Sequence, residues 1–514
     1  MTNWDVLTAE LAALEHAGLL GQTHTVASAQ GAWVTVDGQR VLHLCANHYL
    51  GLANHPRLRE AAHAASERFG VGPAAVRSIA GTLSLHQELA QQWAAFKGVA
   101  ATLALQSGFN ANLAVIPALV QEDDAIFSDA LHQASIIDGC RLSRAQVIRY
   151  RHGDPDDLAA TLARTGGVRQ RLVMTDGVFS MDGEGAPLPQ IGAVAVQHEA
   201  LVMVDAAHGE GVRGLGGRGI SQHVGLLGQV DVEVGTLAKA FGVIGGYMAG
   251  RQVLIDSLQQ RARPSLCSSA TTAADVAACL AAVALLQESP ERGEQLWEHT
   301  RFFQARLRAL GFDLGRTQTP IPAVMIGEAQ HAKTLSAPLF SAGVFVQAVA
   351  LPTVPRGTAR LRVRLSAAHS REDVVFALET LARLGRACQL IPAACGGVPR
   401  WKEGPDRWST RICLSPRILL RQPPRPWCMP WRRRRSIRPG SPCSTCSTTI
   451  PRPRSTTSPM RHSTGPALRR SSGPGCPRCP PTLRRPSGVT TMKRPACTYK
   501  PWCLRPVRGP GRCR

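Results

Sequence analysis

The 514-residue chain lacks any apolar run of the roughly 18 residues that a membrane-crossing helix needs. Its first 20 residues, "MTNWDVLTAELAALEHAGLL", also lack the basic stretch and apolar core that make a signal peptide. The spacing of their apolar residues predicts a helix instead. We therefore expect no membrane span and no secretory leader, and we expect a cytoplasmic protein.

Acidic residues are almost missing from the last quarter of the chain. Residues 391–514 hold 27 of the 59 Lys and Arg residues but only two of the 36 acids. Residues 1–390 keep 32 basic and 34 acidic residues, a net charge of −2, so the formal charge of +23 comes from the tail. The body and the tail must be interpreted separately.

Cysteine is scarce in the body, which holds only five of the 15 cysteines. These five are scattered and odd in number, which argues against a disulfide framework and for a reducing compartment. They are Cys45, Cys140, Cys267, Cys279 and Cys388.

Short apolar runs alternate with amphipathic stretches through the first part of the body, and several runs are apolar on both faces. Such runs are typical of buried parallel strands, and their alternation with helices indicates an α/β domain with a mostly parallel sheet. We expect strands at 101–105, 124–129, 146–150, 171–176, 201–205 and 230–237.

The pattern changes after about residue 285. A long helical stretch from 291 to 311 precedes short strands at 322–327, 343–349 and 359–367, and a last helix spans 371–391. This order predicts a smaller α+β domain. We expect an N-terminal helix and segment over 1–55, a large domain over 56–285, a small domain over 286–391, and a tail over 392–514.

Two of the predicted strands end at, or just before, residues whose side chains could take part in catalysis. Asp205 ends an apolar run, with His208 three residues on, and Lys239 follows the next strand in a Gly-rich setting. In open parallel sheets, ligands bind at the carboxyl ends of strands. Such a lysine could form a Schiff base, and such an acid could hold a protonated pyridine nitrogen. Taken singly, Asp205 is better explained as a helix cap and Lys239 as a solvated loop residue.

Together, these residues stand within blocks that resemble the pyridoxal-phosphate (PLP) α-oxoamine synthases, most of all the glycine C-acetyltransferases. The resemblance spans 45–391 and implies a fold-type I, aspartate aminotransferase-like α/β transferase. Its blocks are "CANHYLGLANHP" (45–56), "IAGTLSLHQELA" (79–90), "SGFNAN" (107–112), "ASIIDGCRL" (134–142), "TDGVFSMDGEGAPLP" (175–189), "GTLAKAFG" (235–242) and "RLRVRLSAAHS" (360–370).

The resemblance implies a cofactor site. Lys239 would carry PLP covalently and act as the base at the substrate Cα, and Asp205 would pair with the ring nitrogen. His208 and Ser180 would hydrogen-bond the phenolic oxygen. The phosphate would be held by the following residues: the backbone amides of Gly108 and Phe109 at a helix start, the Thr236 hydroxyl, and Ser268 or Ser269 from the partner of a homodimer.

The resemblance also implies a carboxylate site for an amino acid. Arg362 would hold the carboxylate with a bidentate fork, and Asn47 would lie beside it. Spacing alone would instead make Arg362 one exposed arginine of a strand in which Arg360, Arg362 and Arg364 alternate. It would make Asn47 an ordinary turn residue.

One departure from the family concerns the residue that stacks on the PLP ring. The family has His there, whereas here Gln133 takes the position and His132 comes one residue early. Gln133 would lie flat on the ring without acting as an imidazole, or His132 would reach in by a local rearrangement.

The expected reaction is condensation of glycine with an acyl-CoA, acetyl-CoA first, to a 2-amino-3-oxo acid with release of CoA. The alternative within the family is 8-amino-7-oxononanoate synthase, which joins alanine to a pimeloyl thioester and decarboxylates the product. We expect no metal site in the body.

Three interpretations of residues 392–514 compete. The arginine run in "PWRRRRSIRPG" (430–440) would suit a basic arm that binds nucleic acid. Two Cys-x-x-Cys pairs, at 443–446 and 476–479, would suit zinc. We favour an out-of-frame translation, because the tail has no Phe and one Tyr among many Arg, Pro and Cys. In each case we expect disorder, since the tail lacks apolar surface, and we do not expect nucleic acid as a partner.

Overall fold

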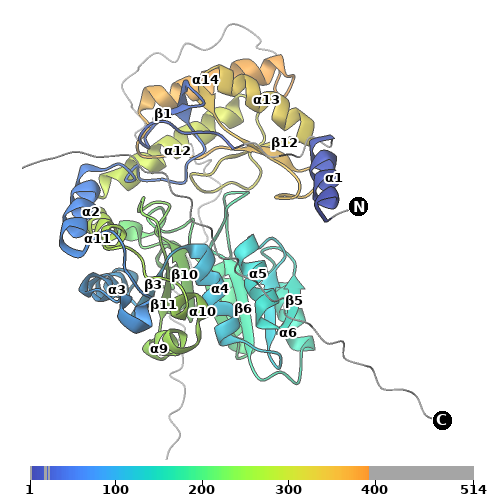
Figure 1. Ribbon diagram of the computed structural model, residues 1–514. Helices are drawn as coiled ribbons and strands as arrows, with labels where there is room; N and C mark the ends of the chain where they lie inside the picture. Colours follow the sequence, from blue (N-terminus) through green and yellow to red (C-terminus); the bar gives the residue numbers. More distant parts are fainter. Residues whose placement is uncertain (1–2, 17–19, 21–22, 393–514) are drawn as a thin grey trace, which may run out of the picture. The chain divides into compact units, whose positions relative to one another are not determined.

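The computed structural model describes residues 3–16, 20 and 23–392 (Figure 1). The predicted N-terminal helix is present as α1 (Asn3–His16). The predicted disorder of the tail, its arginine run and its cysteine pairs lie outside the described residues.

A seven-stranded sheet lies within the region that we expect to form the large domain, in the order β3-β11-β10-β9-β6-β4-β5. All six strands predicted for this region are present, and the five from β10 to β5 are parallel. The seventh, β11, runs antiparallel to both neighbours and was missed, because its sequence "GYMAG" is short and bounded by glycine. The bounds are β3 (Ala101–Leu105), β4 (Ala125–Asp129), β5 (Gln146–Tyr150), β6 (Arg171–Asp176), β9 (Leu201–Asp205), β10 (Val232–Thr236) and β11 (Gly246–Gly250).

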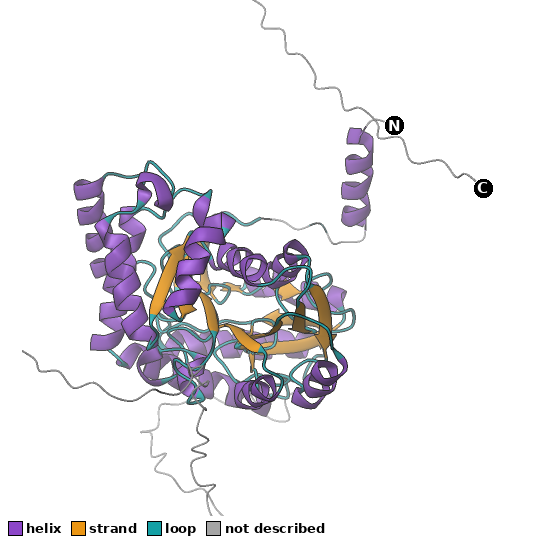
Figure 2. Ribbon diagram, turned by 90° about the horizontal axis from the view of Figure 1, so that it is seen from below, coloured by secondary structure: helices purple, strands orange, loops and turns teal. Residues whose placement is uncertain are grey.

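Helices cover both faces of this sheet (Figure 2). On one face, Leu172 and Met174 of β6 join a core cluster with residues of α4 (Gly108–Leu119), α5 (Ala134–Ser143) and α9 (Gln252–Arg261). On the other, Val173 joins a cluster with residues of α3 (Ser84–Lys97), α6 (Pro155–Arg164) and α7 (Leu188–Gln197). Burial on both faces explains why β3, β6 and β9 are apolar at successive positions, whereas the edge strand β5 is mostly exposed.

Shorter elements and two further helices complete the region that we expect to form the large domain. Helix α11 (Ala273–Glu288) packs against α2 (Pro56–Phe69) and α3. The others are η1 (Arg77–Gly81), the hairpin β7–β8 (Val178–Phe179, Glu184–Gly185), η2 (Leu215–Gly217), α8 (Ile220–His223) and α10 (Arg263–Leu266).

The C-terminal part contains two three-stranded sheets. One has the order β12-β15-β14, with β12 (Ala323–Gly327), β14 (Ala348–Val349) and β15 (Ala359–Arg362). The other has the order β1-β2-β13, with β1 (Trp33–Val36), β2 (Gln39–His43) and β13 (Val344–Phe345). In it, β13 pairs with β2, and β1 and β2 come from near the N-terminus and are drawn blue among orange elements in Figure 1. The helices of the C-terminal part are α12 (Glu291–Ala309), α13 (Ala329–Ser341) and α14 (Arg371–Ala387). The domain boundaries at 55, 285 and 391 remain predictions.

A buried ion cluster ties α3 to the sheet. Lys97 Nζ lies 2.6 Å from Glu210 Oε1 and also contacts Glu233 of β10, and all three side chains are at most 4% exposed. Ser221 donates a hydrogen bond of 2.9 Å to Glu233. Burial raises the pKa of Glu210 to about 8, although Lys97 opposes the shift. The cluster anchors the segment that follows β9.

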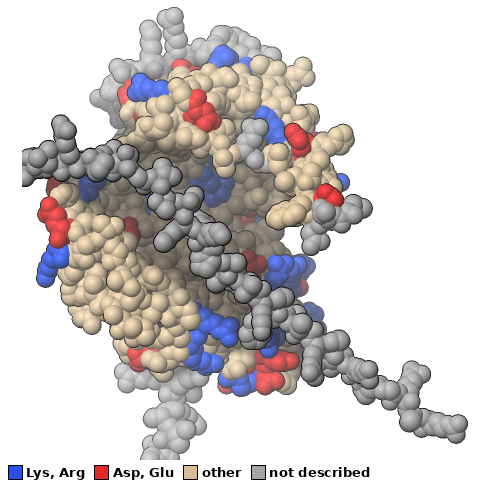
Figure 3. Space-filling model, in the orientation of Figure 1, with Lys and Arg blue, Asp and Glu red and all other residues tan. Residues whose placement is uncertain are grey.

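Within residues 3–16, 20 and 23–392, no single helix has both the length and the apolar character needed to cross a membrane; α11 and α12 meet that test only as a pair bent by 75°. Over the described surface shown in Figure 3, basic and acidic side chains interleave.

Candidate active site

The carboxyl ends of three neighbouring strands bring together the residues with the strongest chemical signal. Asp176 at the end of β6 lies directly beside Asp205 at the end of β9, and Asp205 pairs with Val234 of β10. Lys239 follows β10 by three residues and interacts electrostatically with both carboxylates. Loss of hydration lowers the pKa of Lys239 to about 8, although the negative charge of Asp205 acts to raise it. A neutral amine, as Schiff-base chemistry requires, is therefore accessible near neutral pH.

Asp205 is held by three donors. Its Oδ2 accepts hydrogen bonds from the side-chain amides of Asn112 (2.8 Å) and Gln133 (2.6 Å), and its Oδ1 accepts one from the Ala207 backbone (3.0 Å). Burial raises the pKa of this carboxyl group, and Lys239 and Asn112 oppose the rise. Sequence reasoning missed Asn112, although it ends the "SGFNAN" block, because nothing local indicates that α4 faces the end of β9.

The structure places Gln133, rather than His132, beside these carboxylates. Gln133 stands at the N-cap position of α5, and its side-chain amide, rather than capping the helix, also donates a 3.0 Å hydrogen bond to Asp176. His132 turns the other way and bonds Ser128 at 2.8 Å, and burial lowers its pKa to about 4. The alternative in which His132 reaches the site is therefore not the one observed.

His208 lies near Lys239 and is paired with a tyrosine from the N-terminal segment. Tyr49 Oη is 2.8 Å from His208 Nδ1, and both side chains are buried. Burial, followed by the positive charges of Lys239 and Arg362, lowers the pKa of His208 well below its usual value. The neutral ring can therefore act as a hydrogen-bond partner. Tyr49 was missed as a site residue, although it stands inside the "CANHYLGL" block.

The start of α4 presents the backbone amides that we expect to hold a phosphate. Ser107 caps this helix, and the amides of Gly108 and Phe109 precede the first intrahelical hydrogen bond. A Cβ on Gly108 would lie 3.1 Å from Thr236 Cβ and 3.2 Å from Gly235 O, so the helix start packs against the end of β10. The Thr236 hydroxyl donates to Gly245 O at 2.9 Å.

The structure distinguishes the three alternating arginines. Arg360 forms an ion pair with Asp182, and Arg364 donates to Cys45 O. Arg362 is buried, reaches the Met181 sulfur at 3.6 Å, and has a buried Nε without a hydrogen-bond partner among the described residues. Burial lowers its pKa to about 10. Of the three, Arg362 is the one whose charge lacks an acidic or carbonyl partner in the described part of the chain, which contradicts the interpretation of it as an ordinary exposed strand residue.

The predicted serine contacts lie on two other segments, one after β7 and one after α10. Ser180 directly follows β7 and is half-buried. Ser268 is half-buried, and Ser269 is exposed, forms an isolated bridge with Val76 and accepts a hydrogen bond from Gln106 through its carbonyl. Their contacts with a cofactor or across a subunit interface remain predictions.

The residues present fit PLP. Lys239 offers an amine beside Asp205, and the start of α4 offers amides at a place where a Cβ on Gly108 would crowd Thr236 and Gly235. Arg362 Nε and Asn47 Oδ1 are buried polar atoms without hydrogen bonds to the described residues, as expected of groups that await a ligand.

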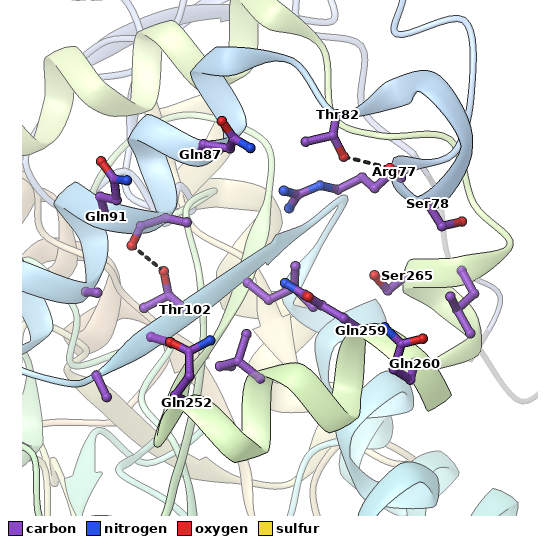
Figure 4. Close-up of a pocket in the computed structure, with 17 residues that line it drawn as sticks. Arg77, Ser78, Thr82, Gln87, Gln91, Thr102, Gln252, Gln259, Gln260 and Ser265 are labelled. Atoms are coloured by element: carbon purple, nitrogen blue, oxygen red, sulfur yellow. Dashed lines mark hydrogen bonds between the residues drawn. The ribbon is translucent and has the colours of Figure 1, made fainter.

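A separate cavity of about 790 Å³ lies between α3, β3, α9 and the segment around η1 (Figure 4). Its lining includes Arg77, Gln87, Thr102 and Gln259, and a dashed line marks the bond from Thr102 to Ala90 O. None of the predicted site residues lines it, so it is not where the chemistry described above would occur.

The fold and the site together define a fold-type I PLP-dependent transferase. A family model described as "Aminotransferase class I and II" matches residues 39–381. The 8-amino-7-oxononanoate synthase of Thermosipho melanesiensis is 51% identical over 391 residues, 76% of this chain and 100% of that protein. That of Fervidobacterium nodosum is 52% identical over 395 residues, 76% of this chain and 100% of that protein.

Among solved structures, the serine palmitoyltransferase of S. paucimobilis with bound PLP-myriocin aldimine superposes with a TM-score of 0.72 and 30% identity, covering 76% of this chain and 99% of that one. The chain therefore belongs to the class I and II aminotransferase family, and within it to the PLP-dependent α-oxoamine synthases. The family expected from the sequence is confirmed. The glycine C-acetyltransferase branch is not specifically supported.

Proposed function

We propose that this protein is an 8-amino-7-oxononanoate synthase, which joins alanine to a pimeloyl thioester and releases carbon dioxide and the free thiol. The observation that carries the proposal is the shared name of two relatives that are 51% and 52% identical over their full length. These names favour the alternative weighed from the sequence over glycine and acetyl-CoA, which was the first expectation.

PLP, when bound, supplies an electron sink that stabilises negative charge at the amino-acid Cα. Lys239 would hold the cofactor and move the Cα proton, since its lowered pKa makes the neutral amine available. Asp205 would accept a hydrogen bond from the ring nitrogen. Arg362 would bind the alanine carboxylate, with Asn47 beside it, because its guanidinium is buried without an anion. His208, oriented by Tyr49, would hydrogen-bond the phenolic oxygen.

The test is a comparison of substrate pairs with the purified, PLP-loaded chain. Release of carbon dioxide and of free thiol would be measured with alanine and pimeloyl-CoA, and thiol release alone with glycine and acetyl-CoA. We expect the first pair to give the larger kcat/KM and equimolar carbon dioxide and thiol. Lys239→Ala should abolish both signals. Preference for glycine and acetyl-CoA without carbon dioxide would overturn the proposal and restore the glycine enzyme.

Two further points are part of the proposal. We infer a homodimer, because Ser268 and Ser269 match a segment that in this family serves the neighbouring site, and analytical ultracentrifugation tests this. We infer a cytoplasmic location from the five body cysteines, which are free thiols among the described residues.

A further inference from the structure

Two carboxylates are buried side by side at the site that we expect to bind the cofactor. Asp176 and Asp205 are register partners on adjacent strands and are 5% and 4% exposed. Two like charges so placed repel one another in a poorly hydrated environment. Gln133 is the group that bridges them, since its amide nitrogen lies 3.0 Å from Asp176 Oδ1 and 2.6 Å from Asp205 Oδ2.

Gln133 donates to Asp205, the same carboxylate that we expect to pair with the ring nitrogen of the cofactor. Asp205 Oδ1 is engaged by a backbone amide, and Oδ2 already accepts from both Asn112 and Gln133. A carboxylate oxygen has about two lone-pair directions, so a pyridine N–H that approaches Oδ2 would be a third donor there. A ring nitrogen bound on the Oδ2 side therefore displaces one of the two amides.

Gln133 is the more readily displaced of the two. Asn112 is 1% exposed and is also held by Ser135, to which its amide donates at 3.0 Å. Gln133 is half-buried, and Asp176 can retain it: Asp176 Oδ1 already accepts its amide, and Asp176 Oδ2 is buried without a partner among the described residues.

We propose that Gln133 is a placeholder for the ring nitrogen of the cofactor, and that Asp176 is the positioning residue that retains the Gln133 amide when PLP takes over Asp205 Oδ2. Without cofactor, Gln133 screens the carboxylate pair. With cofactor, Gln133 shifts onto Asp176, and the ring nitrogen supplies the donor that Asp205 loses. The raised pKa values of both acids, caused first by burial, agree with this need for donors.

The inference rests on PLP binding and does not depend on which amino acid or thioester reacts. Its test uses pyridoxine 5′-phosphate, which has the ring nitrogen and the phosphate but cannot form a Schiff base with Lys239. The dissociation constant would be measured on cofactor-free protein by quenching of tryptophan fluorescence. Failure of the substrate proposal would leave this measurement unaffected.

Replacing the amide by an apolar side chain of similar volume is the first variant. Gln133→Leu should bind pyridoxine 5′-phosphate about tenfold more tightly, because the analogue no longer displaces a charge-assisted hydrogen bond. The cofactor-free variant should melt at a lower temperature than the parent, because the carboxylate pair has lost its bridge. Gln92→Ala, on the exposed face of α3, is the control and should change neither quantity.

Equal or weaker binding by Gln133→Leu would overturn the placeholder role and support the interpretation that Gln133 packs against the ring. If this variant does not fold, Gln133→Ala is judged by the same criterion. The role of Asp176 is tested by a double-mutant cycle. Asp176→Ala should weaken binding in the parent and have little effect in Gln133→Leu. An equal effect in both backgrounds would show that Asp176 does not act through Gln133.

Discussion

At the scale of single residues, the partners of a side chain decide its role more than its place in a sequence pattern. Arg360 and Arg362 are both buried on β15, two positions apart and with the same side chain. Asp182 neutralises the first, whereas a methionine sulfur is the contact of the second. An arginine buried in this way destabilises the empty protein and is suited to an anionic substrate.

The two arginines should therefore respond oppositely to the same substitution. Arg362→Met should raise KM for the amino acid about 10- to 100-fold, because the carboxylate loses its charge-assisted hydrogen bonds. We expect a smaller change in kcat. It should not lower the melting temperature of the cofactor-free protein, because it removes a charge that burial disfavours. Steady-state kinetics and thermal melting check both points.

Arg360→Met is the matched control for this prediction. It breaks the pair with Asp182 and should destabilise the fold by about 1–3 kcal/mol, while KM for the amino acid stays near the parent value. If both variants raised KM equally, Arg362 would not be the specific carboxylate ligand.

At the scale of elements, the start of α4 reaches its position because two strands leave room for it. A Cβ on Gly246 of β11 would lie 2.3 Å from Ser107 C and 2.4 Å from Gly108 N, both backbone atoms. The helix N-terminus that we expect to hold the phosphate thus depends on a glycine in a strand that the sequence pattern did not predict.

Gly246→Ala should push the start of α4 off the sheet. We expect a loss of about 1–3 kcal/mol in the free energy of unfolding and weaker binding of pyridoxine 5′-phosphate, because backbone cannot move aside as a side chain can. Denaturant titration and fluorescence quenching measure the two effects.

Gly192→Ala tests the same substitution where space is open. Gly192 lies inside α7, and no described atom beyond its own helix lies within 4 Å of the position that a Cβ would take there. This variant should gain about 0.5–1 kcal/mol and bind the analogue normally. A similar loss in both variants would contradict the argument from close approach.

At the scale of the whole molecule, the described core is complete by Pro392. Ile391 is 5% exposed and belongs to the main core cluster, and Leu390 N donates to Gly385 O at 2.8 Å. The Thermosipho relative is covered over its full length by 76% of this chain. Residues 393–514 are therefore not required to complete the fold of the family.

A chain that ends at residue 392 should keep the melting temperature of the full chain to within about 2 °C and bind pyridoxine 5′-phosphate with the same affinity. A chain that ends at residue 387 removes the buried Ile391 and should lose about 1.5–3 kcal/mol. Loss of folding or of binding in the longer truncation would show that the tail contributes to the enzyme. Sequencing of the 3′ end of the gene tests the out-of-frame interpretation separately.

The sequence by itself determined the six strands it predicted for the central sheet, the α/β class, the family and the cofactor. Each rests on a local property: runs apolar at successive positions, or short blocks in a known order. These properties can be recognised without knowledge of the fold, because a strand buried on both faces is apolar at successive positions wherever it lies in the sheet.

Only the tertiary structure decided which side chains meet. It set Tyr49 against His208 across 159 positions, paired β2 with β13, and turned Gln133 rather than His132 toward Asp205. It also distinguished Arg362 from Arg360. Such contacts depend on how distant segments pack and on which buried polar atoms find partners. The periodicity of apolar residues along the chain gives no information about either.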